Sequence, residues 1–122
     1  FNYNLNEFIP PLIKSFGRLQ QVTSFMASKG LNNPEEAAGP ATDYLKMFSL
    51  VAIGYVWTQY AEISFNKQND DPEGFYKAKI ASGKYYMLKI LPETGSIMSS
   101  ILSGAKYYND FDDKYFDSGF IL

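Results

Sequence analysis

Apolar residues form an uninterrupted run through the middle of the chain. The stretch 47–57, MFSLVAIGYVW, contains no charged residue. In a helix with about 3.6 residues per turn, its large side chains point in every direction and leave no polar face for water. We therefore expect a central helix that other helices shelter on all sides. A membrane span needs ~18 or more apolar residues, so the pattern predicts no transmembrane segment.

Prolines that lie next to capping side chains mark the helix starts. Pro10 and Pro11 lack amide donors, which a first helical turn does not need. Asn33 and Asp71 each precede a proline and an acid, an order typical of a first turn. Pro92 ends or bends one helix and opens the next. The expected helices cover residues 10–29, 34–66 with a kink near 39–40, 72–91 and 92–103, followed by an irregular C-terminal tail.

The pattern favours an all-α fold, an antiparallel bundle of about four helices. No strand alternation or internal repeat competes with the helical periodicity. The 122 residues fit one domain, which we expect to span 1–122. Gly30 and Gly104 are the expected terminators of the first and fourth helices.

Small residues predict where the second and third helices approach each other. Such residues let two helix backbones come close together. On the second helix they are Gly54, Thr58 and Ala61, and on the third Ala78, Ala81 and Ser82. We expect these two faces to meet.

The composition excludes several kinds of chemistry. The chain has no cysteine and no histidine, so it lacks thiolates and imidazoles for catalysis or metal binding. Its 11 basic and 13 acidic residues give no strong positive field, which makes nucleic acid an unexpected partner. Glycine-rich phosphate motifs and nucleophile elbows are absent from the sequence. The paired acids, Glu35-Glu36, Asp70-Asp71 and Asp112-Asp113, are interpreted as caps and solubility charges.

Lysines and aromatic residues leave more than one interpretation open. The third helix carries Lys77, Lys79, Lys84 and Lys89 with no acid after Glu73. These lysines form a solvated face, or they meet a phosphate, an acidic partner or the aspartate-rich tail. Aromatic residues at helical spacing are expected in the core or an interface rather than in a ligand pocket; they are Trp57, Tyr44, Tyr55, Tyr60, Tyr85 and Tyr86.

Two segments resemble a known family. The run 41–61, ATDYLKMFSLVAIGYVWTQYA, and the run 75–105, FYKAKIASGKYYMLKILPETGSIMSSILSGA, are similar to the helical C-terminal extension of acyl-CoA dehydrogenases, in particular the methylthiopropionyl-CoA dehydrogenase-like subgroup. Gly83 departs from this pattern, since a better helix former is expected there. The structural or interface candidates are Tyr44, Gly54, Trp57, Lys79 and Pro92.

The resemblance implies a flavoprotein setting. Members of the family oxidise an acyl-CoA thioester in fatty acid β-oxidation, with a glutamate as base and FAD as hydride acceptor. No residue of this chain matches those motifs, so we assign it no catalytic, cofactor-binding or metal-binding residue. Because the chain opens with Phe1, we expect a C-terminal fragment of a larger oxidoreductase.

The implied role is a non-catalytic domain that packs against the preceding dehydrogenase domains. Such packing would support oligomerisation, for example as a homo-oligomer, or would shape the acyl pocket. The expected location is cytoplasmic. One alternative is a free-standing helical module for protein–protein interaction, and another is a bundle that binds a small apolar ligand between its helices.

Overall fold

The computed structural model describes residues 5–32 and 39–110, and side chains within 5–31 and 39–103. The regular elements in this part of the chain are all helical, with turns between them and no β-strand, which confirms the all-α class. The helices are α1 (Ile9–Asn32), α3 (Ala41–Lys67), a 3₁₀ turn η2 (Gln68–Asp70), α4 (Phe75–Tyr85), a π-helical turn η3 (Tyr86–Ile90) and α5 (Glu93–Asp110).

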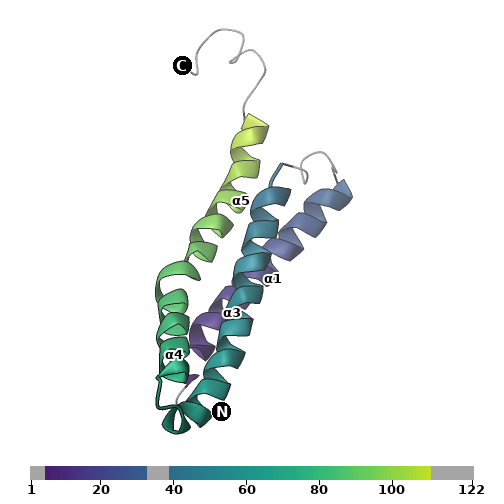
Figure 1. Cartoon of the computed structure of the whole chain (residues 1–122). Helices are drawn as coiled ribbons and strands as arrows, with labels where there is room; N and C mark the ends of the chain where they lie inside the picture. Colours follow the sequence, from purple (N-terminus) through teal and green to yellow (C-terminus); the bar gives the residue numbers. More distant parts are fainter. Residues whose placement is uncertain (1–4, 33–38, 111–122) are drawn as a thin grey trace, which may run out of the picture.

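The described helices pack as three rods rather than as four separate helices. Figure 1 shows α3 running antiparallel to α1, while α4, η3 and α5 follow one bent path beside them. The amide of Leu91 donates to the carbonyl of Tyr86 at 2.8 Å, and the amide of Thr94 then donates to Leu91 at 3.0 Å. Because these bonds carry the backbone past Pro92, this proline bends the rod without ending it.

Several expected helix ends differ from the observed ones. Helix α1 continues through Gly30 to Asn32, and α5 continues through Gly104 to Asp110. Among the described residues, Gly74 is the one glycine with a positive φ, at 79°. Gly30 therefore lacks the left-handed conformation that a glycine terminator adopts. The expected irregular tail is helical as far as Asp110, and its remainder lies outside the described residues.

Helix α3 starts directly after the interruption expected near 39–40, whereas α4 starts later than expected. Pro40 directly precedes α3, and the amide of Tyr44 in this helix donates to the carbonyl of Pro40 at 2.9 Å. The expected start at residue 34 lies outside the described residues. Helix α4 begins at Phe75 rather than at residue 72, and the carboxylate of Asp71 accepts the amide of Tyr76 at 2.8 Å. Asp71 thus satisfies an amide of the first turn of α4, in the way that capping residues do.

Two hydrophobic clusters hold the rods together along their length. The first contains the buried side chains of Leu5, Phe8, Ala61, Tyr86, Met87 and Leu91. The second contains Leu19, Val22, Met47, Val51 and Ile101. Each cluster draws side chains from α3 and from both neighbouring rods, so α3 contributes to the whole core.

The apolar helix at the centre of the sequence is nevertheless not sheltered on all sides. Met47, Val51 and Gly54 of α3 are buried, but Phe48 is 49% exposed and Tyr55 is 55% exposed. The expectation of complete burial is therefore wrong for this chain. Two neighbouring rods cover only one side of α3, and the opposite apolar side faces solvent. No helix in the described ranges is both long and apolar enough to cross a lipid bilayer.

The predicted contact between two small-residue faces is also wrong. Gly54 and Ala61 are buried, but Ala78, Ala81 and Ser82 are exposed. Helix α4 instead turns Ile80 and Gly83 toward the core. Gly54 packs against Leu91, since a Cβ built on Gly54 would lie 3.3 Å from the Cδ1 atom of that leucine.

Candidate docking surface

A groove between α1 and α3 is the first part of an exposed apolar surface. Its volume is about 400 Å³, and its walls are formed by Leu12, Ile13, Phe16, Leu19, Phe48, Val51, Ala52 and Tyr55. Ile13, Phe16, Phe48 and Tyr55 are all exposed. Of the residues that form the groove, only Tyr55 carries a polar side-chain atom, and the side-chain Nε2 of Gln59 donates to its hydroxyl at 3.2 Å. The groove therefore fits an apolar surface and offers no charged group.

The outward side of α3 continues this surface along the helix. Its exposed apolar side chains, apart from those in the groove, are Leu45, Ile53, Val56, Tyr60 and Ile63. Single exposed apolar residues are ordinary, whereas a continuous apolar face is typical of interaction sites. We call this face, together with the groove, the α3 apolar face.

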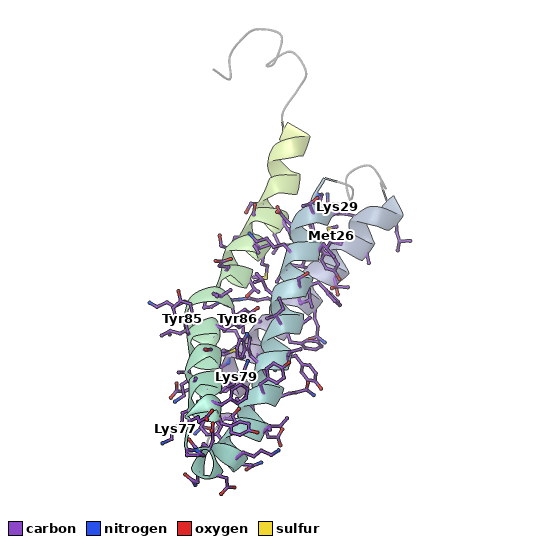
Figure 2. All side chains as sticks on the ribbon, viewed as in Figure 1. Met26, Lys29, Lys77, Lys79, Tyr85 and Tyr86 are labelled. Atoms are coloured by element: carbon purple, nitrogen blue, oxygen red, sulfur yellow. The ribbon has the colours of Figure 1, made fainter. Side chains whose placement is uncertain are left out.

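A lysine surrounded by aromatic rings borders the α3 apolar face. The ammonium of Lys79 lies 5.8 Å from the ring centroid of Trp57, 5.7 Å from that of Tyr60 and 5.4 Å from that of Phe75. Trp57 and Tyr60 pack edge to face, with 5.9 Å between their centroids. Figure 2 shows Lys79 between α3 and α4, whereas Lys77 lies toward the outside of the same helix. Rings of this kind attract a cation through their electron-rich faces.

Within the described part of the chain, the Lys79 ammonium has aromatic partners but no acidic one. Among the residues that the structure describes, no carboxylate lies within ion-pair distance of it. Lys84 behaves differently, because its ammonium lies 3.5 Å from a carboxylate oxygen of Glu7. Of the four lysines in the expected third helix, one is therefore paired with an acid and one rests on aromatic rings.

Buried polar groups join α1 to the bend before α5. Thr94 is fully buried; its hydroxyl donates to the carbonyl of Leu91 at 2.9 Å and lies 3.4 Å from the hydroxyl of Ser15. The guanidinium of Arg18 donates to the same Thr94 oxygen at 3.2 Å. It also covers Gly95, where an added Cβ would approach its Cζ atom to 3.0 Å. These bonds fix the angle at which α5 leaves the bend.

The structure brings together only some of the sequence candidates. Trp57 and Lys79 are in direct contact, and Gly54 packs on Leu91, the neighbour of Pro92. Tyr44 lies in the second hydrophobic cluster, with its hydroxyl 2.8 Å from that of Thr23. The candidates therefore do not form one site, and whether each serves in an interface stays a prediction.

The sequence pattern predicts a core or interface position for Tyr60 but does not single out Phe75 or Ile13 as part of this surface. Phe75 lies four residues before Lys79, and Tyr60 lies three residues after Trp57, spacings that bring side chains together on a helix. These spacings were the available signal for the Lys79 cluster. Ile13 had no comparable signal, because its exposure depends on what packs beside α1.

Comparison with known proteins agrees with this helical arrangement. A family model described as acetyl-CoA dehydrogenase C-terminal like matches residues 2–112. No curated protein and no solved structure matches the chain. The match spans most of the 122 residues and includes every described helix. The chain therefore belongs to the family of acetyl-CoA dehydrogenase C-terminal-like domains.

Proposed function

We propose that this chain is a non-catalytic helical domain that docks its α3 apolar face on the catalytic body of an FAD-dependent acyl-CoA dehydrogenase. The observation that carries the proposal is the uncharged, solvent-facing side of α3 in a member of this family. Burying such a face against a second domain removes apolar area from water and stabilises both partners. Docking would support the oligomer or shape the acyl pocket of the parent enzyme.

The lining of the α1–α3 groove does not suit FAD or coenzyme A. Both molecules carry a pyrophosphate, which requires cations or converging amide donors. The α1–α3 groove has no charged group in its lining. We therefore derive no catalytic step here and place flavin binding and the glutamate base in the parent enzyme. The resemblance of residues 41–61 and 75–105 supports a parent from the methylthiopropionyl-CoA dehydrogenase-like subgroup.

The gene sequence upstream of residue 1 provides the first test. We expect an open reading frame that continues upstream through a flavin-binding dehydrogenase. A start codon directly before Phe1 would instead support the free-standing interaction module. The purified chain alone should show no flavin absorbance and no turnover of acyl-CoA with an artificial electron acceptor. Either signal from the pure chain would overturn the non-catalytic assignment.

Docking is tested in the full-length polypeptide that this frame encodes. We expect Phe48→Asp to expose the α3 apolar face, because a carboxylate placed in a dry interface is strongly disfavoured. Faster chymotryptic cleavage of the domain, with normal flavin content, is the expected result. Ser99→Asp is the matched control, since Ser99 is exposed on α5, outside this face. Equal cleavage rates for the two variants would contradict docking through α3.

A further inference from the structure

We propose that Lys79 and its three aromatic rings bind a carboxylate of the docking partner, so that the α3 apolar face recognises an apolar surface that carries an acid. This inference rests on the proposed function and names the chemistry of the partner. The rings of Trp57, Tyr60 and Phe75 surround the ammonium, and no described carboxylate neutralises it.

Lys79 borders the α3 apolar face, so the charge that a partner places opposite this ammonium matters for docking. Tyr60 is 47% exposed and belongs both to the Lys79 cluster and to the α3 apolar face. A partner that covers this face therefore also covers the outer side of the ammonium. Docking would remove water from the Lys79 ammonium, and the aromatic rings compensate for that loss only in part. This desolvation costs free energy unless an anion takes the place of the water. A partner carboxylate meets this requirement and also sets the register of docking.

Comparison with the neighbouring lysines singles out Lys79 as the contact for a partner carboxylate. Lys84 already lies 3.5 Å from Glu7, on the side of α4 that faces the start of α1. Lys77 is exposed and contacts no aromatic ring among the side chains that the structure describes. If a partner recognised only a diffuse positive charge, the exposed lysines would be equivalent. The aromatic cluster instead holds the Lys79 ammonium beside the α3 apolar face. The expected partner group is a single aspartate or glutamate within an apolar patch.

A zero-length carbodiimide cross-linker tests this contact in the full-length polypeptide. The reagent joins an amine to a carboxylate only where the two groups are in contact. We expect mass spectrometry to find Lys79 joined to an acid of the preceding domains, with Lys77 giving at least tenfold less product. Equal yields from Lys77 and Lys79 would overturn the inference, because they would indicate surface reactivity alone.

Substitutions separate failure of this inference from failure of the proposed function. We expect Lys79→Met to speed chymotryptic cleavage at the α3 apolar face by about tenfold at low salt, while Lys79→Arg and Lys77→Met leave the rate unchanged. Chymotrypsin prefers hydrophobic residues, so losing a lysine removes no cleavage site. If Lys79→Met matches Lys77→Met while Phe48→Asp still exposes the face, the carboxylate contact is wrong and docking stands. If Phe48→Asp also has no effect, both proposals fail.

Discussion

Gly83 of α4 lies against the ring of Phe8, so closely that a Cβ at position 83 would come within 2.7 Å of the Cε1 atom of that ring. Phe8 is completely buried and packs edge to face with Phe65 at 6.4 Å between centroids. The same Cβ would lie 3.3 Å from Cε3 of Trp57. Glycine, an unfavourable residue in a helix, is therefore required where α4 crosses the start of α1.

Gly83→Ala should destabilise the fold despite the better helix propensity of alanine. The added methyl group overpacks a ring that cannot move aside, at an expected cost of ~1 to 3 kcal/mol in the free energy of unfolding. Gly17→Ala is the control, because a Cβ on this α1 glycine meets nothing within 4 Å. That variant should gain roughly 0.5 to 1 kcal/mol from propensity. Urea denaturation of both variants measures the difference, and equal shifts would contradict the observed packing.

Gly54 should tolerate a small side chain but not a large one. A Cβ there would lie 3.3 Å from Cδ1 of Leu91 and 3.6 Å from Cδ1 of Leu12, and both atoms end flexible side chains. We expect Gly54→Ala to be nearly neutral and Gly54→Leu to lose ~1 to 3 kcal/mol through overpacking. Thermal denaturation monitored by circular dichroism provides the comparison. A Gly54→Leu protein as stable as the parent chain would show that this contact is absent.

Tyr86 should make stability fall at high pH. Its hydroxyl donates to the carbonyl of Leu50, and burial, followed by the charge of Glu93, raises its pKa from 10.0 to about 12. The unfolded chain releases this proton near pH 10, whereas the folded chain keeps it until about pH 12. The stabilising contribution is thus fully present below pH 10 and is lost as pH rises toward 12.

Tyr86→Phe and Tyr85→Phe form a matched pair for this effect. We expect Tyr86→Phe to lose ~1 kcal/mol at neutral pH, the net value of one hydrogen bond, and to show a shallower loss of stability above pH 10. Tyr85 is 61% exposed, so its phenylalanine variant should keep the parental slope. Urea unfolding at a series of alkaline pH values is the measurement. Parallel slopes for both variants would rule out Tyr86 as the source.

Two valines of α3 test which side of that helix is covered. Val51 is 5% exposed and Val56 is 41% exposed, although they lie in the same apolar run. Val51→Ser should cost at least ~2 kcal/mol in the isolated chain, since it removes buried apolar area and adds a buried hydroxyl. Val56→Ser should change stability by less than about 0.5 kcal/mol. Similar losses at both positions in urea denaturation would mean that α3 is covered on both sides.

Much of the fold follows from local signals in the sequence. The spacing of apolar residues and the prolines next to capping side chains predict helices near their observed positions. Both signals act within one or two helical turns. The run 47–57 correctly predicts a helix that contributes to the core, but not that one of its sides is exposed. Phe75 and Lys79 lie four residues apart, but only the packing of α3 beside α4 adds Trp57 and Tyr60 to this pair.

Tertiary structure alone decided the helix ends, the contact faces and the exposed surface. Gly30 and Gly104 look like terminators, but nothing local forces a left-handed conformation at a glycine within a helix that continues to pack. Ala78 and Ala81 are small, yet Gly83 faces the core because the ring of Phe8, distant in sequence, occupies that place. The hydrophobicity of α3 predicts that its sides avoid water, but the number of neighbouring rods determines which side is buried and which stays exposed.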